Sequence, residues 1–251
     1  QYGKRFKEDK NTTEERLNRL LGILLSGIAS FDKEIKTEAF RIIGSHLFNS
    51  NKLLLIEKEQ IFSLMGKKIL TLLAQKEDDE FLFLINSASL NHIYRFISDY
   101  EFNYGSIKGK EKSSIAFFPG SFDPFSLSHK EIAIEIRNQG YEVYLAVDEF
   151  SWSKRTQPHR YRRNIINMTI AHENDIYLFP SEIPINISND KDLRTLKDLF
   201  PNRKVYMVIG TDVLVNASAY DKDGMLIQFP HIIFHRKSLQ SKEGDELILN
   251  K

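Results

Sequence analysis

Apolar residues follow two different patterns along the chain, and the pattern changes near residue 114. In the first part they recur every three or four residues, which places them on one face of an α-helix. Four segments have this spacing: roughly residues 17–28, 35–47, 61–73 and 87–100. All seven prolines lie at or beyond Pro119, and the proline-free stretch before it permits helices. The pattern therefore predicts two packed helical hairpins in residues 1–102, with Asp32 placed to cap the second helix.

Beyond Ser114 the apolar residues form short continuous runs that alternate with segments of helical spacing. The runs are Ile115–Phe118, Val143–Val147, Ile176–Phe179, Val205–Ile209 and Ile232–Phe234. Continuous runs are typical of parallel strands buried on both faces, and their alternation with helices is typical of a doubly wound sheet. We therefore expect a Rossmann-like α/β domain over residues 114–251, after an all-α helical-hairpin domain over residues 1–102. The polar, glycine-containing segment 103–113 is the expected linker.

Composition narrows the class of protein. There are 35 Lys and Arg against 34 Asp and Glu, a net charge of +1 that argues against nucleic acid as a partner. The absence of cysteine excludes disulfides, zinc ribbons and thiol nucleophiles. No uncharged apolar run approaches the roughly 18 residues of a membrane span, and the first ten residues lack the apolar core of a signal peptide. These features predict a cytoplasmic protein with no membrane partner, and the start at Gln1 indicates an excerpt of a longer chain.

The segment from Ile115 to Lys130 has the strongest chemical signal. It predicts a strand that ends at Gly120, a tight turn, and a helix that begins near Leu127. In a doubly wound sheet this junction is where phosphates bind, because the helix N-terminus offers unpaired N–H groups and a positive dipole end. Gly120 would let the backbone approach a ligand closely, and His129, in the first helical turn, can donate to a phosphoryl oxygen.

The same segment resembles the signature of a nucleotidyltransferase superfamily that includes nicotinate mononucleotide and phosphopantetheine adenylyltransferases. The family pattern is Gly, Ser or Thr, Phe-Asp-Pro, any residue, His or Thr, any residue, Gly, His. Residues 120–124 match it, and His129 matches the final His. Ser126 stands where the family has His or Thr, and Ser128 stands where it has Gly.

Further matches follow in the order that the family has them. Gly210-Thr211-Asp212 is similar to the Gly-Ala-Asp segment of nicotinate mononucleotide adenylyltransferases. Tyr220 stands where that subfamily has a Trp that packs on the nicotinate ring. Arg236 ends an apolar run as in the family. Lys154 and the Arg160–Arg163 group lie where the family has a phosphate-binding Lys and a helix-opening Arg.

The resemblance implies an enzyme of NAD biosynthesis that transfers an adenylyl group from ATP to a mononucleotide such as nicotinate mononucleotide, releasing pyrophosphate. It implies catalytic roles for His129, Ser126 and Lys154, and an acceptor contact from Tyr220. The implied nucleotide contacts are Gly120, Ser121, Phe122, Asp123, Ser128, Arg163, Gly210, Thr211, Asp212 and Arg236. Mg²⁺ is implied by the triphosphate, because no cluster of carboxylates is visible as a metal site.

Plainer interpretations stay open for several of these residues. Asp123 can simply cap the following helix, and Tyr220 can be ordinary packing. The five cations between Lys154 and Arg163 can form a solvated helix face, or bind nucleic acid together with Trp152, His159 and Tyr161. The helical domain is interpreted as a module that binds protein or mediates self-association, with only a hint of HEAT-like repeats.

Two rival functions also stay open. One is a catalytically weak nucleotide-binding or regulatory domain on a helical scaffold, motivated by Ser126 and Ser128. The other is a nucleotidyltransferase with a different phosphate acceptor. The family's late Ser/Thr–Arg motif has no match after Arg236, so either the sequence ends before it or the motif is lost.

Overall fold

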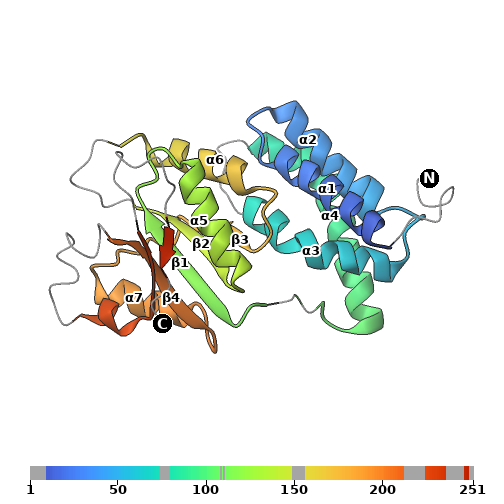
Figure 1. Cartoon of the computed structure of the whole chain (residues 1–251). Coiled ribbons are helices and arrows are strands. Elements are labelled where there is room, and N and C mark those ends of the chain that lie inside the picture. Colours follow the sequence, from blue (N-terminus) through green and yellow to red (C-terminus); the bar gives the residue numbers. More distant parts are fainter. Residues whose placement is uncertain are drawn as a thin grey trace. The chain divides into compact units, whose positions relative to one another are not determined.

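Helices occupy the first part of the chain, and strands alternate with helices in the rest (Figure 1). The computed structural model describes residues 10–73, 80–107, 109, 111–148, 156–211, 224–235 and 246–248. The chain divides into a helical unit, residues 1–110 with 171–174, and an α/β unit, residues 111–170 with 175–251.

The helical unit contains the helices that the apolar spacing predicts. They are α1 (Lys10–Ile28), α2 (Lys33–Arg41), the π-helical turn η2 (Ile42–Phe48), α3 (Leu55–Leu73) and α4 (Glu80–Tyr104). Asp32 caps α2 as expected, because its side chain accepts hydrogen bonds from the N–H groups of Glu34 and Ile35 at 2.8 and 3.2 Å. Helix α4 continues to Tyr104, two residues into the segment expected to be the linker.

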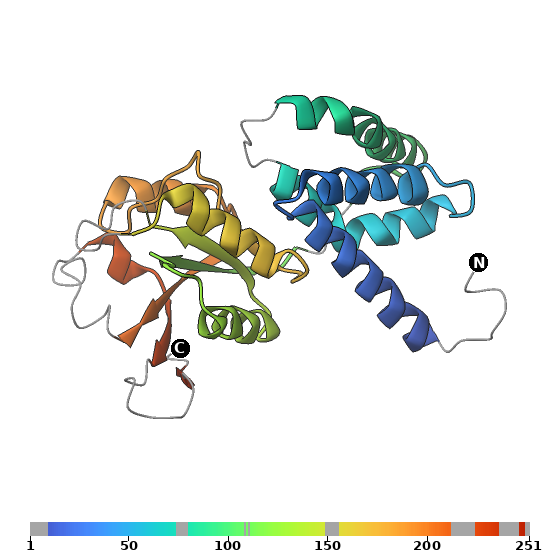
Figure 2. The ribbon, with the colours of Figure 1, turned by 90° about the horizontal axis from the view of Figure 1, so that it is seen from above.

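These helices pack around one apolar core. Helix α1 packs against α2 and α3, and α4 packs against η2, α2 and α3 (Figure 2). The most deeply buried side chains include Leu25, Ile43, Met65 and Ile69. The backbones of η2 and α4 approach so closely at Gly44 that a Cβ there would lie 2.4 Å from Ser89 Cα.

The α/β unit begins with β1, at the point where the pattern of apolar residues changes. Its strands are β1 (Ser114–Gly120), β2 (Glu142–Val147), β3 (Ile176–Leu178), β4 (Lys204–Gly210), β5 (His231–His235) and β6 (Glu246–Ile248). Its helices are α5 (Leu127–Asn138), α6 (His159–Ile170), α7 (Asp190–Asp198) and the 3-10 helix η4 (Met225–Gln228). All five apolar runs singled out in the sequence are strands, whereas β6 lies in a polar segment that gave no such signal.

The strands form one sheet in the order β3-β2-β1-β4-β5-β6. Strands β1 to β5 are parallel, and β6 pairs with β5 in the antiparallel direction. Successive connections lead from β1 to one side of the sheet, through β2 and β3, and then back to β4 on the other side of β1. The order therefore reverses between β1 and β4, as in a Rossmann-like doubly wound fold.

Each face of the sheet has its own apolar layer. On one face α5 and α6 contribute Ile136 and Ile166 to a layer with Phe118 of β1 and Leu145 of β2. On the other face α7 contributes Leu193 to a layer that includes alternate strand residues and part of η4. Burial on both faces explains why these strands have continuous apolar runs.

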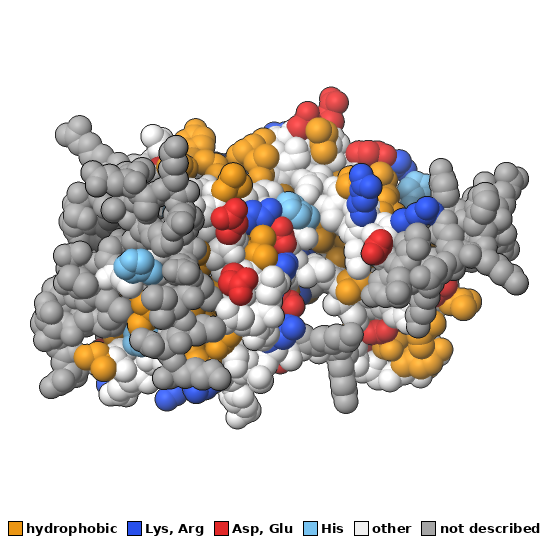
Figure 3. Space-filling view, in the orientation of Figure 1, with side chains coloured by type: hydrophobic (Ala, Val, Ile, Leu, Met, Phe, Trp, Pro, Cys, Tyr) orange, Lys and Arg blue, Asp and Glu red, His pale blue; other side chains and the backbone are white. Residues whose placement is uncertain are grey.

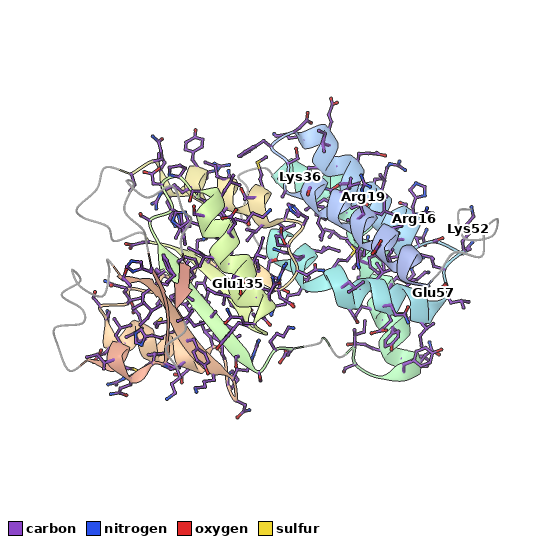
Figure 4. The ribbon with its side chains drawn as sticks, viewed as in Figure 1. Arg16, Arg19, Lys36, Lys52, Glu57 and Glu135 are labelled. Carbon is purple, nitrogen blue, oxygen red and sulfur yellow. The ribbon has the colours of Figure 1, made fainter. Side chains whose placement is uncertain are left out.

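Charged side chains on the described surface are of both signs and intermixed, as the neutral sequence leads us to expect (Figure 3). Examples are Arg16 and Arg19, exposed on α1, and Glu135, exposed on α5 (Figure 4). Among the helices that the structure describes, none combines the length and the apolar character that crossing a bilayer requires.

Candidate functional site

The carboxyl ends of β1 and β4 lie next to each other at the point where the strand order reverses. Phe117 of β1 pairs with Met207 of β4, and three residues further on these strands end with Gly120 and Gly210. Gly120 ends its strand as the sequence predicts, and Gly210 ends the neighbouring parallel strand at the same, carboxyl edge of the sheet. In open α/β sheets this is the position where ligands bind.

The loop after β1 is shaped by the ring of Phe122. This residue is 2 % exposed, has a positive φ of 43°, and packs edge-on against Phe118 with 5.4 Å between ring centroids. A Cβ at Gly120 would lie 2.9 Å from two atoms of the Phe122 ring. Glycine at position 120 is therefore required by the packing of Phe122, a reason that the sequence alone did not reveal.

Ser126 and His129 form a reciprocal cap at the start of α5. Ser126 Oγ accepts from the His129 N–H at 3.4 Å, and the Ser126 N–H donates to His129 Nδ1 at 3.0 Å. The Ser126 hydroxyl also lies 2.8 Å from Nδ1. Because Nδ1 accepts the backbone bond, the proton of the neutral imidazole belongs on Nε2, which makes Nε2–H a donor.

Aromatic rings fix the plane of the His129 imidazole. It stacks on Phe125 with 5.6 Å between centroids and a 20° interplanar angle, and meets Phe122 edge-on at 5.3 Å. A histidine whose tautomer and ring plane are both set, beside a helix N-terminus, is suited to donate to an anionic oxygen. Ser128, also in the first turn of α5, is exposed.

Asp123 and Arg162 connect this loop to the segments that flank it. Asp123 Oδ2 accepts from the Gln157 N–H at 2.9 Å, across 34 residues of sequence. Arg162 is 4 % exposed, and its Nη1 donates to the Ser121 carbonyl at 2.5 Å. Sequence reasoning did not single out Arg162 as a site residue, yet one signal was present. Arg162 lies four residues before the buried Ile166, on the inner face of α6.

Arg163 lies at the end of a different strand. Its Nη1 donates to the Phe179 carbonyl, just after β3, at 2.9 Å. Strand β3 is two places from β1 in the sheet, whereas the guanidinium of Arg162 is bonded directly to the loop after β1. Arg162 therefore bonds to the loop after β1, whereas Arg163 bonds to the residue after β3.

On the other side of the switch point, Thr211 follows Gly210 at the end of β4. Its Oγ1 lies 3.3 Å from Nδ1 of His235, the last residue of β5. Sequence reasoning did not single out His235 as a site residue. The predicted site residues Lys154, Asp212, Tyr220 and Arg236 lie outside the described residues.

Within the ranges that the structure describes, no group of three His, Asp or Glu side chains is placed to hold a metal ion. His231 lies at the start of β5, the end of the strand that is opposite to the candidate site. Burial lowers the pKa of its imidazole, and a hydrogen bond that the imidazole donates to the Phe229 backbone opposes that effect in part.

Comparison with known proteins decides the family. The family model described as "Cytidylyltransferase-like" matches residues 117–248, just over half of the chain. The chain belongs to the cytidylyltransferase-like family. The matched region begins within β1 and includes all six predicted nucleotide contacts from Gly120 to Arg163, as well as Gly210. This cytidylyltransferase-like chain is a nucleotidyltransferase with a Rossmann-like α/β fold, preceded by helices.

Two solved structures similar to this cytidylyltransferase-like chain are of one parasite protein. Nicotinic acid mononucleotide adenylyltransferase from Plasmodium falciparum, complexed with NaAD, is 21% identical with a TM-score of 0.44, over 52% of this chain and 68% of that chain. The same protein complexed with APC is 22% identical with a TM-score of 0.40, over 53% and 68%. No curated protein sequence matches the chain.

Proposed function

We propose that this protein transfers an adenylyl group from ATP to a mononucleotide such as nicotinate mononucleotide. A phosphate oxygen of the acceptor attacks the α-phosphorus of ATP. The bond between the α-phosphorus and the oxygen that bridges to the β-phosphate breaks, and pyrophosphate leaves. Such a reaction depends on positioning and charge stabilisation, with no covalent enzyme intermediate.

The observation that supports this proposal best is the cap between Ser126 and His129. It assigns Nδ1 to the cap and Nε2–H to donation, at the N-terminus of α5 and beside the switch point. The His129 side chain can then donate to an oxygen of the triphosphate as negative charge develops on the leaving pyrophosphate. Gly210 and Thr211, at the end of the adjacent strand, are proposed to contact the ribose or the acceptor.

We expect Mg²⁺ to arrive bound to the triphosphate. Magnesium usually keeps several waters and binds one or two carboxylates together with substrate phosphates, which requires no cage of protein ligands. Among the described residues, no three His, Asp or Glu side chains come together as such a cage. We also place Lys154 and Arg163 among the cations that neutralise the phosphates.

A second candidate is nucleotide binding with little or no transfer. It is favoured by Ser126, whose hydroxyl is engaged with Nδ1 at 2.8 Å, and by Ser128 in the place of the family glycine. A nucleotidyltransferase with another acceptor is a variant of the first proposal, and the same assay separates the three.

The test measures pyrophosphate release by the full-length protein with Mg²⁺. ATP and CTP are each offered with nicotinate mononucleotide, nicotinamide mononucleotide and phosphopantetheine, and nucleotide binding is measured separately by calorimetry. We expect turnover with ATP and a pyridine mononucleotide. His129→Ala should lower the rate about 100- to 1,000-fold, because one preorganised donor to developing charge is lost.

The matched control is His46→Ala, which removes an exposed histidine of the helical unit and should leave the rate unchanged. A parent rate that survives His129→Ala would refute the role of that residue. ATP binding without transfer to any acceptor would favour the second candidate, and turnover with CTP alone would overturn the proposed nucleotide.

A further inference from the structure

A buried arginine connects three segments at the carboxyl edge of the sheet. Arg162 is 4 % exposed, and within the described part of the chain its guanidinium bonds only to backbone carbonyl oxygens. Nη1 donates to Ser121 O at 2.5 Å and to Asp148 O at 3.2 Å. Nη2 donates to Asp148 O at 3.3 Å, and Nε donates to Gln157 O at 2.9 Å.

These bonds are part of a hydrogen-bond network that surrounds the loop after β1. The Asp148 N–H donates to Gly120 O at 2.9 Å, next to the carbonyl of Ser121 that Arg162 holds. Gln157 offers its carbonyl to Arg162 and its N–H to Asp123. Gly120 is therefore bonded to Asp148 just after β2, Ser121 to Arg162 of α6, and Asp123 to Gln157 just before α6.

Phe122 lies between the residues that this hydrogen-bond network holds, and its ring contacts the imidazole of His129, which the proposed reaction uses. Its ring meets His129 edge-on with centroids 5.3 Å apart, and its backbone has a φ of 43° that a phenylalanine seldom adopts. Anchors on both neighbours, Ser121 and Asp123, stabilise this conformation. A shift of the loop would move the Phe122 ring and, with it, the plane of His129.

We propose that Arg162 is a positioning residue for His129, acting through the loop Ser121–Asp123 and the ring of Phe122. The proposal rests on the proposed function for its effect on transfer, but not for its effect on the geometry of His129. An arginine fits this task because its planar fork directs several donors at fixed angles to carbonyls on different segments. A lysine at the same place keeps the charge but offers all its donors from one nitrogen.

The test compares Arg162→Lys and Arg162→Met with the parent at pH 8. Histidine is labelled with ¹⁵N, and the ring resonances of His129 are assigned by their loss in His129→Ala. In the parent we expect well separated Nδ1 and Nε2 resonances, the signature of a single neutral tautomer. In both variants this separation should shrink, because the cap to the Ser126 N–H is no longer held in one geometry.

The same variants are assayed for transfer, ATP affinity and thermal unfolding. We expect Arg162→Lys to lower kcat by about 10²-fold with the KM for ATP little changed, the size of effect that a displacement of about 1 Å can produce. Arg194→Lys, an exposed arginine of α7, is the matched control and should match the parent in every measurement.

Asp123→Ala removes the other anchor of the same loop and provides a second test at an exposed position. It should also reduce the separation of the His129 resonances. Combined with Arg162→Lys, it should lower kcat by less than the product of the two single losses, because both act through one loop.

Two results would overturn the proposal. One is a lower melting temperature in Arg162→Lys with the His129 resonances of the parent, which would make the residue merely structural. The other is parent-like behaviour of Arg162→Lys beside a defective Arg162→Met, which would show that charge matters and the fork does not. If the parent transfers nothing to any acceptor, the spectra still decide between these outcomes.

Discussion

The two halves of the sheet differ in how their carboxyl ends are held. On the β1–β2 side, Arg162, Asp123 and the cap at Ser126 tie the strand ends to one another and to α5 and α6. On the β4–β5 side, the described residues show one side-chain hydrogen bond between strand ends, which joins Thr211 Oγ1 and His235 Nδ1. For the proposed reaction, the half assigned to the triphosphate is thus preorganised.

At the amino ends of the strands the two halves are joined. Arg203, just before β4, donates to Glu142 Oε2 of β2 at 2.7 Å and to the Lys112 carbonyl at 2.7 Å. Tyr144 donates its hydroxyl to Glu142 Oε1 at 2.5 Å. Burial raises the pKa of the Tyr144 phenol well above its ordinary value, and the charge of Glu142 adds to this effect. The phenol is therefore a donor at any physiological pH.

Removing the carboxylate of Glu142 is the change with the largest expected effect. Glu142→Leu leaves the mostly buried guanidinium of Arg203 without its carboxylate partner, and loss of one member of a buried ion pair typically lowers the free energy of unfolding by about 3–5 kcal/mol. Urea unfolding followed by circular dichroism measures the loss of stability. Glu135→Leu, an exposed glutamate of α5, is the control and should change stability by no more than about 0.5 kcal/mol. Equal stability of the two variants would contradict the joining role.

Loss of a helix cap should affect stability equally in the two halves but activity in only one. Ser126→Ala and Asn189→Ala each remove a side chain that caps a helix, α5 and α7 respectively, and each should cost about 1 kcal/mol. Only Ser126→Ala should also slow transfer, by less than His129→Ala does. The measurement pairs urea unfolding with the pyrophosphate assay, and a similar loss of transfer in Asn189→Ala would remove the distinction between the halves.

A smaller effect is expected at the end of β4. Thr211→Val keeps the shape of the side chain but removes a hydroxyl that we assign to the ribose or the acceptor. The KM for the acceptor should rise about threefold, in keeping with the net value of one neutral hydrogen bond, while kcat stays near that of the parent. Thr195→Val, exposed on α7, is the control. A larger drop in kcat than in acceptor affinity would place Thr211 with the preorganised half.

The smallest effect concerns pH and His231 at the start of β5. Because burial lowers the pKa of this imidazole, the unfolded chain binds more protons than the folded chain just below the ordinary histidine pKa of about 6.5. The contribution of His231 to stability is therefore present above that pH and is lost as the pH falls through the lower, folded-state pKa. Unfolding of the parent and of His231→Gln between pH 5 and 8 measures it. A variant with an unchanged pH dependence would show that other groups dominate.

Much of the α/β unit could be predicted from the sequence because parallel strands buried on both faces appear as continuous runs of apolar residues. The run Val205–Ile209 is one example, and the residues after Gly120 are another, since a strand end, a turn and a helix start follow at short range. The cap at Asp32 was also accessible, because a capping side chain bonds to the backbone two and three residues away.

What the sequence could not provide depends on partners far along the chain. Arg160 and Arg162 have the same side chain two positions apart, yet one is exposed and the other is buried against the Ser121 carbonyl, 41 residues away. In the helical unit, the close approach of Gly44 to Ser89 depends likewise on a residue in another helix. Local patterns contain no record of such pairings, and their consequences appear only once the chain is folded.

The contact between Gly120 and Phe122 has an evolutionary consequence. A side chain at position 120 and a large ring at position 122 would compete for the same space, since a Cβ on Gly120 would come within 2.9 Å of that ring. In descendants of this sequence, substitutions at positions 120 and 122 are therefore not independent of each other. A lineage that acquires a larger residue at 120 must first, or at the same time, accept a smaller one at 122, and would then lose the ring that packs edge-on against His129. The glycine of the motif is thus preserved by its neighbour as much as by any ligand.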